Sequence, residues 1–330
     1  MRDDLYDLHS EIERRHWWFA GRRQIMRAVV ERLLAEDPAG ASSGDDPPAR
    51  VGGGDGGGGG DGGGGAVVLD IGCGTGANVA ALADLGPVLG MDASAKAVQL
   101  AETRFPQLEF VHAHGPGELA GRLGGVRVAM LMDVIEHLPD DFEAVSGWLA
   151  ALPVGAHLLI TVPADPRLWS RHDEVFGHYR RYTLPRLARV WDGLPVTCRL
   201  LSAYNARLYP VVRGVRAWRR LRGGTERGDD FSTGAGPVNA GLQRVFAGEA
   251  GRLLRALDTP GGAASARGYR HGVSLIAVLR REAGEIAVRR RPADVEPDQH
   301  DPAAAAEVGS TSEDRAAREP SDLSREAGPS

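Results

Sequence analysis

The sequence has 330 residues, and its hydrophobic fraction of 42% and charged fraction of 25% are typical of a globular protein with a buried core. Its formal net charge is −5, and residues 284–330 account for it with eleven acidic residues and six arginines, so the rest of the chain is neutral and offers no global positive field for nucleic acid. Two cysteines, Cys73 and Cys198, are too few for the usual zinc cluster or for a disulfide framework.

Residues 1–36 are predicted to be helical. Apolar residues recur there at the three- and four-residue spacing of one buried helix face: Ile25, Met26, Val29, Val30 and Leu33. The opening residues are charged and lack the apolar core of a signal peptide. No uncharged apolar run reaches the roughly 18 residues that span a bilayer. We therefore expect a cytoplasmic protein.

Two segments are predicted to be disordered. Residues 37–65 are almost wholly Gly, Asp, Ser and Pro, a composition that cannot bury apolar surface and is typical of a flexible linker. Residues 284–330 form an acidic tail without usable periodicity. The main domain is therefore expected at residues 66–283.

The main domain alternates short apolar runs with helical patterns. The expected strands are residues 67–71, 88–91, 108–112, 126–132, 157–162, 198–204 and 273–279. The expected helices are residues 77–85, 94–104, 142–151, 184–191 and 238–257. This order predicts an α/β fold, a Rossmann-like three-layer sandwich with a mostly parallel seven-stranded sheet. Sheets of this kind bind ligands at the carboxyl ends of their strands.

A basic helical insertion is expected at about residues 205–260. Within it, residues 208–221 are amphipathic and rich in arginine. Such a helix either lies on an anionic membrane surface or is an ordinary surface element whose arginine stems cover the core. On the first interpretation, the protein makes peripheral contact with the inner face of a membrane. The sequence does not indicate an oligomeric state.

The strongest motif is the loop from Asp70 to Gly76, DIGCGTG, between a strand and a helix. Glycines let the backbone turn sharply and let a ligand approach the main chain. Gly72, Gly74 and Ala77 also satisfy the dinucleotide fingerprint, so a nicotinamide enzyme is an alternative. Asp92, at the end of the second strand, suits the ribose of either cofactor. Asp70 favours a ligand with a positive amino group, because it would repel a pyrophosphate.

The segments VLDIGCGTG, LGMDAS and MLMDVIEHLPDD together resemble the class I S-adenosylmethionine-dependent methyltransferases. The resemblance covers residues 66–163 and implies S-adenosylmethionine as the cofactor. It places the methionine portion on Asp70 and the loop glycines and the ribose at the end of the second strand. The implied cofactor-binding residues are Asp70, Gly72, Cys73, Gly74, Gly76, Asp92, Ala93, Met132 and Asp133. The family usually has an acidic residue after the third strand, where this sequence has His114 and Gly115. Either His114 or a backbone group takes its place at the adenine, or this contact is lost.

Candidate residues for the methyl acceptor follow the fourth and fifth strands. Glu136 and His137 come after the fourth strand, where His137 is either a general base or a residue that shapes the pocket. The segment 172–183 is unusually dense in polar groups, so His172 and His178 are further candidate bases. The expected acceptor-binding residues in this segment are Asp173, Tyr179, Arg180, Arg181 and Tyr182. A solvated loop is the simpler alternative.

The segment 172–183 and the run from His16 to Phe19 resemble a bacterial subgroup of these methyltransferases. The resemblance implies that the N-terminal helix lies across the cofactor entrance, with Trp17 and Trp18 at the substrate. The predicted reaction is methyl transfer to an O, N or C atom of a small-molecule or lipid-linked acceptor, without a metal ion or nucleic acid. The alternatives are a nicotinamide oxidoreductase and an inactive cofactor-binding module that acts at a membrane or on a protein partner.

Overall fold

The computed structural model describes residues 4–36, 67–221, 236–259 and 268–290, all within one compact unit, Met1–Arg291. The predicted linker 37–65 lies outside the described residues, as does most of the predicted tail. Residues 284–290 of that tail are described, and there Ile286 packs against the core while the backbone N–H of Arg289 donates to Ser146 Oγ at 2.7 Å. The packed chain thus extends beyond the expected boundary at residue 284.

Seven strands form one sheet, as predicted. They are β1 Val68–Ile71, β2 Val88–Asp92, β3 Glu109–His112, β4 Val128–Met132, β5 His157–Pro163, β6 Val196–Tyr204 and β7 Ser274–Arg281. Their order is β3-β2-β1-β4-β5-β7-β6, and β7 runs antiparallel to the other six strands. The chain order reverses between β1 and β4, which is where a ligand crevice opens in sheets of this class.

Helices cover both faces of the sheet. The α-helices are α1 Asp4–Arg15, α2 Trp17–Leu34, α3 Ala77–Leu82, α4 Ala95–Arg104, α5 Asp141–Ala151, α6 Arg171–Phe176, α7 Leu184–Ala188, α8 Tyr209–Leu221, α9 Gly236–Ala247 and α10 Ala250–Leu257. Short 3-10 turns are η1 Ala83–Leu85, η2 Pro116–Arg122, η3 Ile135–His137, η4 Pro166–Leu168 and η5 Arg189–Trp191. None of the described helices is both long and apolar enough to cross a membrane.

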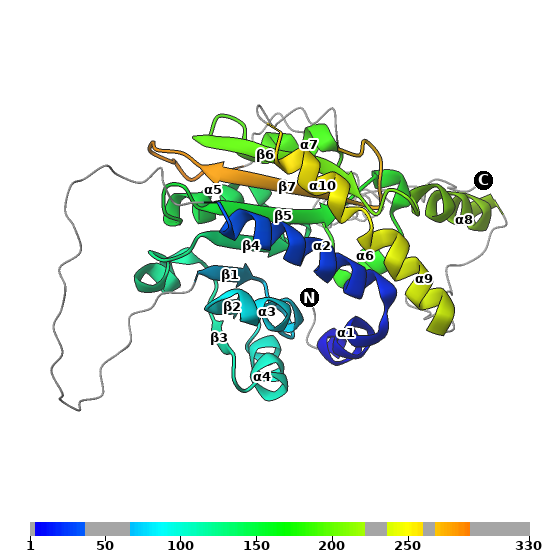
Figure 1. The fold of residues 1–330 in the computed structure, drawn as a ribbon, viewed down its shortest axis with the longest axis horizontal. Coiled ribbons are helices and arrows are strands. Elements are labelled where there is room, and N and C mark those ends of the chain that lie inside the picture. Colours follow the sequence, from blue (N-terminus) through cyan, green and yellow to red (C-terminus); the bar gives the residue numbers. More distant parts are fainter. Residues whose placement is uncertain (1–3, 37–66, 222–235, 260–267, 291–330) are drawn as a thin grey trace, which may run out of the picture. The chain divides into compact units, whose positions relative to one another are not determined.

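The core has two halves, one on each side of the sheet. Val68 of β1 packs with α2, α3 and α10, whereas its neighbour Leu69 packs with α5 and α7. This alternation follows from the two-residue period of a strand, which sends successive side chains to opposite faces. Figure 1 shows α2 and α10 running across one face of the sheet. The three-layer α/β sandwich expected from the sequence is confirmed.

Two predicted helices are each broken once. The N-terminal helix stops at Arg15 and restarts at Trp17, because the His16 side chain caps the second helix by accepting a hydrogen bond from the backbone N–H of Trp18 at 3.2 Å. The helix expected at residues 238–257 breaks before Glu249, whose buried Oε1 accepts from the backbone N–H of Arg207 at 2.9 Å. A local capping contact therefore marks the first break, and a contact with a residue distant in sequence lies at the second.

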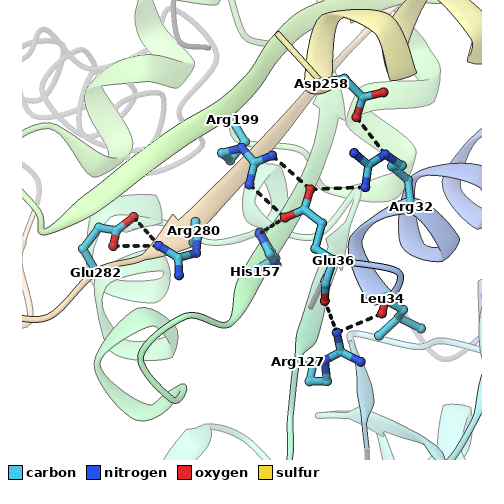
Figure 2. A network of polar contacts seen from close by, with 9 residues as sticks. All are labelled: Arg32, Leu34, Glu36, Arg127, His157, Arg199, Asp258, Arg280 and Glu282. Atoms are coloured by element: carbon cyan, nitrogen blue, oxygen red, sulfur yellow. Dashed lines mark hydrogen bonds and ion pairs between the residues drawn. The ribbon is translucent and has the colours of Figure 1, made fainter. Parts of the chain in front are cut away.

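Glu36, just after α2, anchors the N-terminal helices to the sheet (Figure 2). Its carboxylate accepts two hydrogen bonds from Arg199 of β6, at 2.9 and 3.0 Å, and its backbone carbonyl accepts one from Arg127 at 2.7 Å. His157 of β5 also lies 3.7 Å from this carboxylate. Burial alone would raise the pKa of Glu36, but the hydrogen bond and charge of Arg199, together with the charges of His157 and Arg32, hold the pKa below its usual range. This network fixes the end of α2 against the sheet, although the predicted linker separates α2 from the sheet in the sequence.

Replacing Glu36 with glutamine should lower the free energy of unfolding by about 1–2 kcal/mol at neutral pH, because the amide loses the charge-assisted bonds to Arg199. The effect should fade in acid, since a carboxylate with a lowered pKa loses its stabilising charge as the pH falls through that pKa. Urea denaturation at neutral and at acidic pH measures the loss of stability and its dependence on pH. The control is Glu282→Gln, which removes the more exposed pair with Arg280 and should cost less than about 0.5 kcal/mol. Equal effects of the two variants would contradict the anchoring role.

Candidate functional site

A cavity of about 590 Å³ lies at the carboxyl ends of β1, β2 and β4. Ile71, Asp92 and Met132, at the ends of these strands, form part of its wall. Trp17 from the N-terminal helices and Val211 from α8 also line it, so segments that are far apart in the sequence enclose it. This is the place at which the strand order predicts ligand binding.

The glycine loop forms one wall of the cavity and requires its glycines. Gly72, Gly74 and Gly76 have φ angles of +71°, +54° and +80°, a region that residues with a Cβ rarely adopt. A Cβ on Gly72 would lie 2.7 Å from Val134 Cγ2, whereas a Cβ on Gly74 would meet no protein atom within 4 Å. The backbone at Gly74 is therefore open to a ligand. Gly76 does not line the cavity; it is the N-cap residue directly before α3.

Asp92 ties the glycine loop to the end of β2. Its Oδ2 accepts a hydrogen bond from the backbone N–H of Gly74 at 2.9 Å, and its Oδ1 accepts one from Ser94 at 2.9 Å. Each oxygen keeps a second lone pair, and the residue lines the cavity. The carboxylate can thus hold the loop and accept hydrogen bonds from a ligand's hydroxyl groups at once.

Asp70 lies buried behind the loop, outside the cavity wall. Neither of its carboxylate oxygens makes a hydrogen bond of normal geometry with the described residues, although the Asn78 side chain lies near enough to lower the pKa. Burial raises the pKa of Asp70 to about 7, with the nearby charge of Arg22 acting in the opposite direction. A buried carboxylate beside an open backbone suits a ligand that carries a positive group, such as the amino group of S-adenosylmethionine.

Arg22 is a cavity residue that the sequence reasoning missed. Its guanidinium is ion-paired with Asp133, packs 4.8 Å from the ring centroid of Trp18 and lies fully within the protein. Asp133 follows β4 with a φ of +58°, a strained conformation for a residue with a Cβ. One signal was available: Arg22 falls three residues before Ile25 and so interrupts the apolar face of the helix.

A second missed contact joins α1 to the glycine loop. Glu13 is buried, and its Oε2 accepts hydrogen bonds from Thr75 Oγ1 at 2.9 Å and from Arg104 at 3.1 Å. Glu13 and Thr75 both line the cavity. No sequence signal distinguishes Glu13 from the other charged residues of α1, because its role depends on contacts with distant segments.

The three candidate histidines lie together on the wall of the same cavity. His137, His172 and His178 all line the cavity, with ring centroids of His137 and His178 4.6 Å apart and those of His172 and His178 5.9 Å apart. Burial and the neighbouring His178 lower the pKa values of His137 and His172 to about 3. Glu136 lies beside them, and burial together with Asp133 raises its pKa well above the usual range.

The polar segment after β5 is mostly buried rather than open to a ligand, which corrects part of the prediction. Arg180 is 1% exposed and donates to the carbonyls of Leu138 and Pro139 at 2.7 and 2.9 Å. Tyr182 is fully buried, and its hydroxyl donates to Asp141 at 2.8 Å. These side chains satisfy backbone and carboxylate groups inside the fold, so neither is placed to bind an acceptor.

Asp173 is also fully buried, and it accepts two hydrogen bonds from Arg181, at 2.8 and 3.0 Å. Arg181 reaches the cavity wall, but its guanidinium is held by Asp173 and by the carbonyl of Ala164. Tyr179 does not line the cavity; its backbone N–H donates to the carbonyl of Glu136 at 2.7 Å. Asp173 and Tyr179 therefore hold the segment in place, away from any acceptor.

The remaining predicted site residues lie on the cavity wall. They are Trp17, Trp18, Cys73, Ala93, His114, Met132 and Asp133. His114 is largely exposed, with its backbone N–H donating to Glu118 at 3.1 Å. The structure therefore brings most of the expected cofactor residues together with the two tryptophans and the histidines.

Comparison with known proteins agrees with this site. Residues 68–152 match the model of a methyltransferase domain. The chain is 26% identical over 160 residues to trans-aconitate 2-methyltransferase from Rhodopseudomonas palustris (strain HaA2), an alignment that covers 47% of this chain and 60% of that protein. The chain thus spans less than two thirds of the length of this curated relative.

Solved methyltransferase structures are similar at low identity. The plantazolicin methyltransferase BpumL in complex with SAH is 13% identical, with a TM-score of 0.47, and the alignment covers 85% of this chain and 91% of that one. Phosphoethanolamine N-methyltransferase 2 from Haemonchus contortus, in complex with S-adenosyl-L-methionine, is 14% identical, with a TM-score of 0.38 and coverage of 66% and 49%.

The matched residues 68–152 contain the glycine loop, Asp92 and the segment after β4, which all contribute to the cavity wall. The buried Asp70 and the open backbone at Gly74 fit S-adenosylmethionine. Residues 68–152 therefore form a methyltransferase domain, and the similarities support a class I S-adenosylmethionine-dependent methyltransferase.

Proposed function

We propose that this protein transfers a methyl group from S-adenosylmethionine to a small-molecule or lipid-linked acceptor that binds in the same cavity. The observation that carries the proposal is the combination of an open, positive-φ glycine loop with Asp70 buried behind it and Asp92 at the end of the next strand. Two carboxylates at this loop favour a ligand with an amino group and ribose hydroxyls over a pyrophosphate.

Two charged residues of the cavity wall would bind the ends of the cofactor. Asp92 accepts from ribose hydroxyls, and Arg22 binds a carboxylate while it remains beside Asp133. Asp70, buried behind the loop, adds negative charge that attracts the amino group without contacting it. The bound cofactor supplies a methyl group activated by a positively charged sulfur. The protein's own contribution is to align an acceptor with that methyl group and to exclude water.

The acceptor side of the cavity is partly apolar. Val211, Val212 and Val215 of α8 line it, and the same helix leaves Trp218 53% exposed and Leu221 87% exposed. An apolar wall that continues into exposed apolar side chains favours an acceptor with a hydrocarbon portion. On this proposal α8 rests on a membrane surface, and its arginines contact anionic head groups. On this proposal the acceptor binds beside His137, His172 and His178, which line the same cavity.

Cofactor binding distinguishes this proposal from a nicotinamide oxidoreductase. Isothermal titration should show saturable binding of S-adenosylhomocysteine and no binding of NAD. Incubation of cell extract with the enzyme and methyl-labelled cofactor, followed by mass spectrometry of the labelled products, then identifies the acceptor. Binding of NAD alone would favour the oxidoreductase. Cofactor binding without any labelled product would favour an inactive binding module.

Asp92→Ala should weaken S-adenosylhomocysteine binding by about 100-fold, because the variant loses hydrogen bonds to the ribose and also frees the N–H of Gly74. Isothermal titration measures the loss. The control is Asp84→Asn, which alters an exposed pair with Arg27 outside the cavity and should leave the affinity unchanged. Unchanged affinity in the folded Asp92→Ala variant would contradict the assigned ribose contact.

Arg22→Ala should weaken S-adenosylhomocysteine binding by at least about 10-fold through loss of the carboxylate contact. The matched control on the same helix is Arg27→Ala, because Arg27 bonds Asp84 and the carbonyl of Ala81 outside the cavity. Circular dichroism establishes that both variants are folded. If both variants bind the ligand equally well, Arg22 does not contact it.

Asp70→Asn should change how the stability of the ligand-free protein depends on pH. The folded-state pKa of Asp70 is about 7, above that of an unfolded chain, so ionisation of this buried group lowers stability progressively between about pH 4 and pH 7. Asparagine cannot ionise, so the variant should gain up to about 4 kcal/mol over the wild type across that range. Urea denaturation at several pH values tests this, with the exposed Asp192→Asn as the control. Parallel pH curves for wild type and Asp70→Asn would refute the buried ionisation.

A further inference from the structure

We infer that Glu136, His137 and His178 form a binding site for a divalent transition-metal ion in the cavity wall. One ligand atom from each residue lies within 4.8 Å of the other two. Two imidazoles and one carboxylate are the ligand set of a common class of catalytic zinc site, in which a fourth position stays open for water or substrate.

The surroundings of Glu136 suit a side chain that coordinates a metal ion. The residue is fully buried, and neither carboxylate oxygen has a hydrogen-bond partner among the described residues. Nδ1 of His137 is likewise buried without a partner there. Burial of an unsatisfied carboxylate beside an unsatisfied imidazole nitrogen is unfavourable. A cation bound between them would satisfy both the Glu136 carboxylate and Nδ1 of His137.

His178 is oriented as metal-binding histidines usually are. Its Nδ1–H donates to Asp173 Oδ1 at 2.9 Å, which leaves Nε2 available as a ligand. Asp173 is itself held by Arg181 and by the backbone N–H of Ser170 at 2.8 Å. A carboxylate that fixes the tautomer of a ligand histidine is the outer-shell arrangement that tunes metal affinity.

Backbone contacts bring the two segments of the site together. The carbonyl of Glu136 accepts a hydrogen bond from the backbone N–H of Tyr179 at 2.7 Å, so the residue after His178 is fixed against the turn that carries Glu136 and His137. Zinc with bonds of about 2.0–2.1 Å separates its ligand atoms by about 3.3 Å. The side chains would therefore close by no more than about 1.5 Å, a movement that side-chain rotation can supply.

The role of the ion rests on the proposed function. His137 and His178 line the same cavity as the glycine loop, so a ligand in the open position faces the cofactor's side of the cavity. An acceptor hydroxyl held there would lose its proton more readily. Its oxygen would then form a bond to the methyl carbon as the carbon–sulfur bond breaks and the sulfur keeps the electron pair, with the proton released to solvent. The site thus favours an oxygen acceptor among the O, N and C alternatives.

The test uses the full-length protein, stripped with a chelator, and Zn²⁺ alone as the probe in isothermal titration. We expect one equivalent of Zn²⁺ to bind in the presence of excess Mg²⁺, and Co²⁺ to give a visible absorption band at the same stoichiometry. Glu136→Gln and His178→Gln should each weaken binding by at least about 10-fold, and Asp173→Asn by about 10-fold. The control is His271→Gln, a histidine outside the cavity that should bind Zn²⁺ as the wild type does.

S-adenosylhomocysteine affinity, measured on the same samples, shows that the variants are folded and keeps the two proposals apart. Stoichiometric Zn²⁺ binding that is lost in Glu136→Gln and His178→Gln while S-adenosylhomocysteine still binds would support the site. Absence of Zn²⁺ binding, or binding unchanged in both variants, would overturn the metal site alone. Absence of S-adenosylhomocysteine binding to the wild type would overturn the proposed function, whatever Zn²⁺ does.

Discussion

The ion pair between Arg22 and Asp133 is the contact on which the cavity depends. Burial alone would lower the pKa of Arg22, yet the charge of Asp133, together with that of Glu13 and other nearby groups, raises it and keeps the guanidinium ionised inside the protein. The pair joins α2 to the carboxyl end of β4, and Trp17 and Trp18 at the start of this helix line the cavity. Because a buried arginine without its carboxylate would be very costly, the position of α2 is strongly constrained.

Two buried acidic groups, one in the cavity wall and one behind it, have carboxylate oxygens that no hydrogen bond of normal geometry satisfies among the described residues. Asp70 lies behind the glycine loop, and Glu136 lies beside the histidines; burial raises the pKa of each. Under our proposals each faces a positive charge, the amino group of the cofactor at Asp70 and a metal ion at Glu136. Two buried negative charges without partners lower the stability of the ligand-free protein. Ligands that neutralise them would therefore raise the free energy of unfolding.

Much of the fold and of the cofactor site could be predicted because both depend on short stretches of sequence. Buried parallel strands appear as apolar runs, and the glycine loop combines a strand end, a tight turn and a helix start within seven residues. The predicted acceptor residues were less reliable. Arg180 and Tyr182 stand in a segment dense in polar groups, but their partners are the carbonyls after η3 and the buried Asp141. Local composition cannot distinguish a polar side chain that faces a ligand from one that satisfies the interior.

The sequence by itself determined the sheet and most of its helices, the glycine loop with Asp70 and Asp92, and the resemblance to methyltransferases, because hydrophobic periodicity and turn chemistry act over neighbouring residues. Only the tertiary structure decided that Arg22 and Glu13 belong to the site, that Asp70 lies behind the cavity wall, and that Glu136 meets His178. These relations join residues far apart in the chain. They arise from the packing of α1 and α2 over the sheet and from the return of the segment after β5 toward β4.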